Sequence, residues 1–163
     1  MEVSEHGSCD IEAAYSRLLV LGKPVDFSEL VEEFRISGHD PGSSERIIEV
    51  LGTHSDNVKC TRMRADSLRS LPGGTIIHTG TMDNGHYVTL LSTDGRSANV
   101  VDNGSVVSIS HSALLRDCSG VVLCSPPRLE AFYPLAYLLL VAMLASAACV
   151  SIKRYAHRNY RHE

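Results

Sequence analysis

Three residues of this chain could together form a nucleophilic site. Cys9 stands at the start of a segment with helical apolar spacing, His86 opens the alternating stretch Gly-His-Tyr-Val, and Asp102 ends the alternating stretch that follows. The thiolate is the reactive form of cysteine, and a helix N-terminus favours it. An imidazole can take the thiol proton, and a carboxylate can orient the ring. The three residue types therefore predict a cysteine nucleophile with its base and orienter.

Helices are expected in the first third of the chain, and the first of them carries the thiol. Apolar residues recur at helical spacing over 10–21, and Gly-Lys-Pro at 22–24 ends that helix. Asp26 with Glu29 three positions later reads as a capping box for a second helix to about residue 34. Ser43 or Ser44 caps a third helix, which runs to about residue 51.

The rest of the domain changes to the short alternating segments that are typical of strands. A helical turn is expected at 66–71 and a short helix at 110–116. The predicted strands cover 58–63, 75–78, 86–91, 97–101, 106–109 and 120–124. Helices followed by an antiparallel sheet indicate an α+β domain, with the thiol on the helical half and the imidazole and carboxylate on the sheet half.

The last part of the chain has the composition of a membrane anchor. Residues 131–152 contain no charged side chain over 22 positions, which as a helix spans roughly the 30 Å of a bilayer core. Lys153 and Arg154 follow it directly. A buried C-terminal helix is the alternative. The expected organisation is a domain with the three candidate residues at 1–125, a linker at 126–130, a transmembrane helix at 131–152 and a basic tail at 153–163.

Charge and cysteine usage exclude several other classes of protein. The net charge is −4, and the basic excess lies in the tail, so the domain is acidic and does not suit nucleic acid. Five cysteines without regular spacing do not indicate a disulfide framework, although Cys118 and Cys124 could pair. No zinc-type spacing of Cys or His occurs, and no cofactor is implied. Residues 1–7 are polar and acidic, so no secretory signal is expected.

The motifs, taken together, resemble the cysteine peptidases that remove double-glycine leaders from bacteriocin precursors. In that family an Asp-Cys-Gly precedes the first helix and a Gly-Lys-Pro-like turn follows it, as Cys9 and residues 22–24 do here. Residues 25–30, Val-Asp-Phe-Ser-Glu-Leu, match the family's second helix. Its Gly-His-Phe/Tyr-Val-Val-Leu strand corresponds to 85–90, and its Val-Asp-Pro turn corresponds to 101–103.

This resemblance covers about residues 8–125 and has consequences for fold and chemistry. It implies a papain-like α+β fold in which Cys9 is the nucleophile, His86 the base and Asp102 the orienter of the ring. The family domain is best known at the N-terminus of peptide-exporting transporters. No Walker-type glycine-rich loop is present in this chain, so a transporter would be a separate partner. A peptide or protein is the implied substrate.

Two positions depart from the family pattern. The family places a glutamine about six residues before the nucleophile to help bind the oxyanion, and here that position is Val3. Losing one oxyanion donor typically costs roughly 10²–10³ in rate. Glu2 and Glu5 cannot donate as carboxylates, and His6 is the one substitute nearby. Asp10 replaces the glycine after the nucleophile; its carboxylate suits a helix start, yet its charge disfavours a neighbouring thiolate.

Each candidate residue also has an ordinary structural interpretation. Cys9 alone reads as a buried structural thiol, His86 as a satisfied imidazole, and Asp102 as a turn former in Asp-Asn-Gly. Asn103 is an alternative orienter of the imidazole. The remaining histidines with no partner pattern are His39, His54, His78 and His111. Two functions stay open: a membrane-anchored cysteine peptidase, and a catalytically impaired peptide-binding module with the same fold. For the domain we expect the cytosolic side, which keeps the thiol reduced, although the positive-inside rule favours the opposite orientation.

Overall fold

Three helices form the N-terminal part of the computed structural model, which describes residues 9–81 and 85–126. They are α1 (Cys9–Val20), α2 (Phe27–Ile36) and α3 (Ser44–Thr53). The carboxylate of Asp26 caps α2 by accepting the backbone N–H groups of Ser28 and Glu29 at 2.8 and 3.3 Å. The hydroxyl of Ser43 caps α3 by accepting the N–H of Arg46 at 3.3 Å. Both predicted caps are confirmed, because short polar side chains satisfy N–H groups that a helix leaves unpaired.

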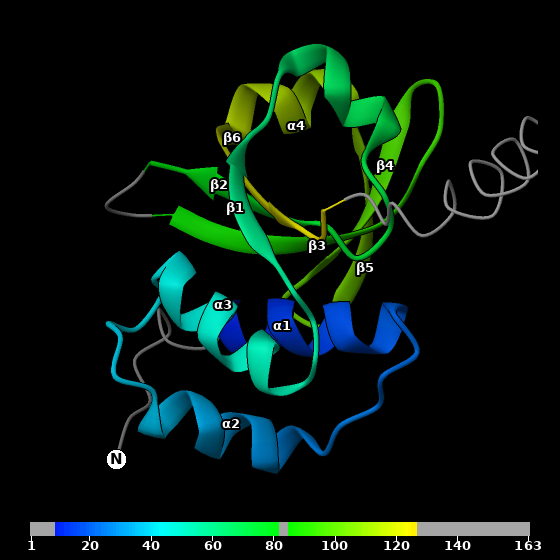
Figure 1. The fold of residues 1–163 in the computed structure, drawn as a ribbon. Coiled ribbons are helices and arrows are strands. Elements are labelled where there is room, and N and C mark those ends of the chain that lie inside the picture. The colour runs from blue at the N-terminus through cyan, green and yellow to red at the C-terminus, as the bar shows by residue number, and fades with distance from the viewer. Residues whose placement is uncertain (1–8, 82–84, 127–163) are drawn as a thin grey trace, which may run out of the picture. The chain divides into compact units, whose positions relative to one another are not determined.

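The described residues then form a six-stranded antiparallel sheet. Its strands are β1 (Lys59–Arg62), β2 (Ile76–Gly80), β3 (Gly85–Thr93), β4 (Ser97–Asp102), β5 (Ser105–Ser110) and β6 (Cys118–Cys124), in the order β1-β6-β2-β3-β4-β5. A 3₁₀ helix, η2 (Ala65–Ser70), and a short helix, α4 (His111–Asp117), interrupt the strands. In Figure 1, α1 to α3 cover one face of the sheet, and η2 and α4 lie over the other.

The two faces of the sheet bury separate apolar cores. Because successive side chains of a strand point to opposite faces, Tyr87 packs with the helices, while Val88 packs on the side of η2 and α4. The helix-side core includes Cys9, Ala14, Leu18, Leu30, Phe34, Ile47, Leu51, Ile76, Tyr87 and Leu123. The opposite core consists of Leu68, Ile77, Val88, Leu90, Ala98, Val100, Leu114 and Val122. The predicted α+β architecture is therefore confirmed.

Two details differ from the sequence prediction. The strand predicted at 58–63 is shorter in the structure: β1 covers Lys59–Arg62, pairs with β6 at the edge of the sheet, and has all four residues exposed. The possible Cys118–Cys124 disulfide is wrong, since both thiols are free. They stand at the two ends of the seven-residue strand β6, about 20 Å apart for an extended chain, which no disulfide can span.

The predicted membrane segment lies outside the part of the chain that the structure describes. Within residues 9–81 and 85–126, no helix combines the length and apolar character needed to cross a bilayer. The segment 131–152, the linker from 127 and the basic tail stay sequence predictions.

Candidate active site

Cys9 is the first residue of α1, as the sequence predicts, but it is more enclosed than expected. Only 7% of the residue is exposed, because it packs into the helix-side core with Ala13 and Tyr87. A reactive cysteine is usually partly exposed, whereas Cys9 is buried. The position places the sulfur at the N-terminal end of α1.

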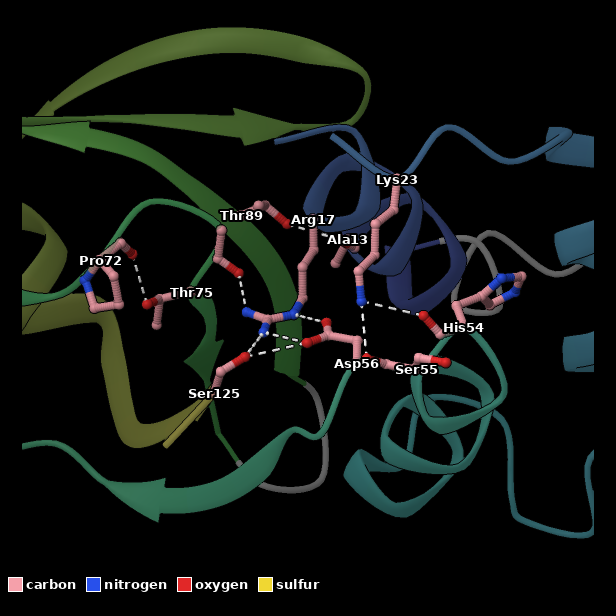
Figure 2. Close-up of polar contacts among 11 residues, drawn as sticks. Ala13, Arg17, Lys23, His54, Ser55, Asp56, Pro72, Thr75, Thr89 and Ser125 are labelled. Atoms are coloured by element: carbon pink, nitrogen blue, oxygen red, sulfur yellow. Dashed lines mark hydrogen bonds and ion pairs between the residues drawn. The ribbon is translucent and has the colours of Figure 1, made fainter. Parts of the chain in front are cut away.

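A hydrogen bond between α1 and β3 sets the distance between the thiol-bearing helix and the histidine-bearing strand. The hydroxyl of Thr89 donates to the carbonyl oxygen of Ala13 at 2.8 Å, and both groups are buried (Figure 2). Ala13 lies about one turn after Cys9, and Thr89 lies three residues after His86. This bond therefore fixes α1 against the strand close to both candidate residues.

His86 and Asp102 meet at one end of the sheet. His86 is the second residue of β3, and Asp102 is the last residue of β4, which pairs with β3. His86 Nε2 lies 2.7 Å from Asp102 Oδ1, and each side chain is one-third exposed. A carboxylate only accepts, so Nε2 is the donor and carries the proton.

Asp102 both precedes a turn and contacts the imidazole of His86, so its turn-forming and ring-orienting interpretations are compatible. Asn103 and Gly104 have φ values of 47° and 71° and connect β4 to β5. Paired positive φ values are those of the two-residue hairpin turns that favour Asn-Gly. Asp102 thus precedes a turn and also contacts the imidazole. Asn103, the alternative orienter, belongs to the turn itself and is exposed.

The electrostatics of His86 link it to the thiol as well as to the carboxylate. The pKa of His86 is raised from 6.5 to about 9, first of all by a hydrogen bond with the Cys9 side chain. Burial opposes this rise, and the hydrogen bond and charge of Asp102 and the charge of Cys9 add to it. His86 therefore contacts Asp102 directly, and the side chain of Cys9 lies near enough to raise the pKa of the imidazole.

Asp10 is fully buried beside the thiol, but its charge has a partner. Its Oδ2 accepts the N–H of Gly42 at 3.0 Å and lies 3.4 Å from Nη1 of Arg46, and its Oδ1 accepts the N–H of Ile11 at 2.9 Å. The guanidinium of Arg46 also donates to the carbonyl oxygen of Phe34. Asp10 therefore ties the start of α1 to α3, and the guanidinium of Arg46 faces its carboxylate.

Two neighbours of the site carried no role in the sequence analysis. His78 lies on β2 opposite Tyr87, and its Nδ1 is 2.8 Å from the hydroxyl of Ser119 on β6. The pKa of Tyr87 is raised to about 12, chiefly by burial and then by the charge of Cys9, so the phenol stays neutral.

Val3 and His6, on which the oxyanion argument depends, lie outside the described residues.

Two of the solved structures that share this fold are peptidase domains of transporters. A double-glycine-motif protease from an AMS/PCAT transporter, crystallised with the leader peptide, is 20% identical, with a TM-score of 0.62 over 76% of this chain and 86% of that chain. This chain has the double-glycine peptidase fold. The peptidase domain of Streptococcus ComA, a bifunctional ABC transporter of a quorum-sensing pathway, is 12% identical, with a TM-score of 0.62 over 78% and 96% of the two chains.

Matches at the level of sequence are absent. No family model matches the chain, and no curated protein matches it. At identities of 20% and below, the likeness to the solved peptidase domains shows the fold alone. The predicted resemblance to double-glycine peptidases is confirmed at that level.

Proposed function

We propose that the chain is a membrane-anchored cysteine peptidase in which Cys9, His86 and Asp102 hydrolyse a peptide bond. One observation carries the proposal: His86 Nε2 lies 2.7 Å from Asp102 Oδ1. The pKa of His86, raised to about 9 by its interaction with Cys9 first and then with Asp102, agrees with it. An imidazole held between a thiol and a carboxylate is the arrangement that activates a cysteine nucleophile. The peptidase fold supports the same reading.

The chemical steps follow from these positions. The Cys9 thiolate attacks the scissile carbonyl carbon, and the protonated His86 gives its proton to the leaving amine as the C–N bond breaks. A thioester between Cys9 and the acyl fragment remains. Neutral His86 then takes a proton from water, the hydroxide attacks the thioester, and the thiolate leaves with the acid product released. Asp102 keeps Nε2 protonated throughout and so directs Nδ1 toward the sulfur.

The proposed substrate is a peptide cut after small residues, and the proposed partner is a separate transporter. The two solved domains are parts of transporters, and one was crystallised with a leader peptide. We propose that residues 131–152 anchor the chain and that the domain faces the cytosol, where its four free cysteines among the described residues would stay reduced. Degradation of the domain by protease added outside intact cells would contradict this orientation.

The test is the rate at which iodoacetamide alkylates Cys9 at pH 6 in the full-length protein and in its His86→Ala form. Mass spectrometry of the Cys9 peptide separates this signal from the exposed Cys60. Only about 0.3% of an ordinary thiol with a pKa near 8.5 is ionised at pH 6. Fast labelling that falls at least about tenfold in His86→Ala supports the thiolate–imidazolium pair. Slow labelling in both forms contradicts it.

The burial of Cys9 favours a second candidate function. With 7% of the residue exposed, a substrate carbonyl has little access to the sulfur in this conformation. A peptide-binding module that retains the peptidase fold needs no such access. Tight binding of a double-glycine leader peptide without cleavage, together with slow alkylation of Cys9, would favour this second function over the first.

A further inference from the structure

A second imidazole, that of His78, is buried next to the proposed base. His78 is 7% exposed and stands on β2, where it pairs with Tyr87, while its neighbour Thr79 pairs with His86. The rings of His78 and Tyr87 meet edge to face with their centres 4.9 Å apart. Burying an imidazole is costly unless its nitrogens have partners. The groups that contact the His78 ring therefore indicate its role.

Ser119 of β6 holds this ring from one side and assigns its tautomer. The Ser119 hydroxyl donates to the backbone oxygen of His78 at 3.2 Å, so its one proton is used there. The contact of 2.8 Å between His78 Nδ1 and Ser119 Oγ must then be donated by Nδ1. The hydroxyl also accepts the N–H of Val121 at 3.2 Å. Ser119 thus anchors a neutral His78 that is protonated at Nδ1.

On its other side the ring covers Gly85, the residue before the proposed base. A Cβ placed on Gly85 would lie 1.8 Å from His78 Nε2 and 2.1 Å from Cε1, so only glycine fits beneath the ring. Thr79 adds a second contact from β2, because its hydroxyl donates to the backbone oxygen of His86 at 3.1 Å. The strand β2 therefore holds the backbone on both sides of the His86 Cα.

We propose that His78 is a positioning residue for His86: its ring, anchored by Ser119, presses on Gly85 and keeps the imidazole of His86 in reach of both Cys9 and Asp102. This inference rests on the proposed peptidase function. The lowered pKa of His78, caused by burial first and then by the charge of His86, agrees with a ring that stays neutral beside an imidazolium.

The test compares three variants of the full-length protein by the pH profile of Cys9 alkylation between pH 5 and 9. His78→Asn keeps an amide donor toward Ser119 but removes the ring from Gly85. His78→Phe keeps the ring and loses the donor. His111→Asn is the matched control, since His111 is 8% exposed and its Nε2 lies 2.8 Å from the Thr93 hydroxyl, on the other face of the sheet.

In His78→Asn we expect the rate at pH 6 to fall about tenfold or more and to approach the wild-type rate near pH 9, as for an ordinary thiol. His78→Phe is expected to retain most of the pH 6 rate, and His111→Asn to retain all of it. A role in stability alone would lower the unfolding midpoint without moving this profile. An unchanged profile in His78→Asn, an equal loss in His78→Phe, or the same loss in His111→Asn overturns the proposal.

The same measurements separate this inference from the proposed function. If the wild-type protein itself labels slowly and independently of His86, the peptidase proposal fails, and no base remains to be positioned. If the wild type labels fast and depends on His86 while His78→Asn is unaffected, only the role of His78 fails.

Discussion

The two ends of α1 each carry a buried ion pair, and the two pairs differ in geometry. At the Cys9 end, Asp10 meets Arg46 through one long contact of 3.4 Å. At the other end, Arg17 makes two contacts with Asp56, of 2.5 and 3.1 Å, and a third with the Ser125 hydroxyl at 2.6 Å (Figure 2). The Arg17 guanidinium also donates to the carbonyl oxygen of Gly74.

The difference in geometry indicates that the two ion pairs of α1 have different roles. Arg17 joins α1 to three segments that are distant in sequence, and Asp56 and Ser125 are themselves hydrogen-bonded at 3.1 Å. A bidentate Arg–carboxylate pair of this kind has little freedom, so this end holds the domain together. The guanidinium of Arg46 instead makes its shortest hydrogen bonds to the carbonyl oxygen of Phe34, and its contact with Asp10 is longer. That end sets the charge beside Cys9.

The largest effect is expected from Arg17→Met. This variant leaves Asp56 charged, buried at 4% exposure and without its cation, which typically costs about 3–5 kcal/mol of stability. Urea unfolding of the full-length protein measures the loss. In the fraction that remains folded, the pH profile of Cys9 alkylation should be unchanged, since Arg17 lies two turns from the thiol.

Two controls accompany this variant. Arg17→Met combined with Asp56→Leu removes both charges and should recover most of the lost stability. Arg35→Ala breaks the ion pair between Arg35 and Glu32, whose side chains are 69% and 56% exposed, and should cost far less stability because solvent screens an exposed pair. An equal loss in Arg17→Met and Arg35→Ala would show that burial does not set the strength of these pairs.

A smaller loss of stability, with a change in reactivity, is expected from Arg46→Met. Removing a charged donor from the Phe34 carbonyl and from Asp10 costs about 1.5–3 kcal/mol. The uncompensated carboxylate then disfavours the neighbouring thiolate, so alkylation of Cys9 at pH 6 should slow. Adding Asp10→Asn removes that charge and should restore the rate. If Arg46→Met labels as fast as the wild type, the proposed difference between the two ends of α1 is wrong.

Local signals in the sequence predicted most of the elements of this fold. Asp26 and Ser43 cap their helices through bonds to residues two or three positions away, which a short window contains. The same holds for the turn at Asn103 and Gly104, whose positive φ values suit those two residue types. The order of helices and strands then sufficed for the α+β class and for bringing Cys9, His86 and Asp102 into one proposed site.

Long-range partners were not predictable in the same way. Arg46 meets Asp10 across 36 positions, and Arg17 meets Asp56 across 39, so each pair depends on how the helices and strands pack. His78 acquires its place opposite Tyr87 only through the register of β2 on β3. The burial of Cys9 likewise results from tertiary packing, which cannot be predicted from residue type and helical periodicity.

The smallest expected effect is a pH dependence of the stability contributed by His86, which the ion pair of Arg17 should not show. The folded pKa of His86, about 9, exceeds its ordinary value of 6.5, so the folded state binds its proton more tightly. The resulting stabilisation is complete below about pH 6.5 and is lost as the pH rises through about 9. Because the side chain of His86 is one-third exposed, solvent screening keeps this contribution modest.

Thermal unfolding of the wild type and of His86→Ala at pH 6 and at pH 9.5 measures this contribution. The midpoint difference between the two proteins should be larger at pH 6 and shrink at pH 9.5. The deficit of Arg17→Met should stay constant over the same range, because a guanidinium does not titrate there. If the His86→Ala difference is also constant, His86 does not hold an extra proton in the folded state. The charge argument for the Cys9 end of α1 would then fail, while the structural role of the Arg17 end would stand.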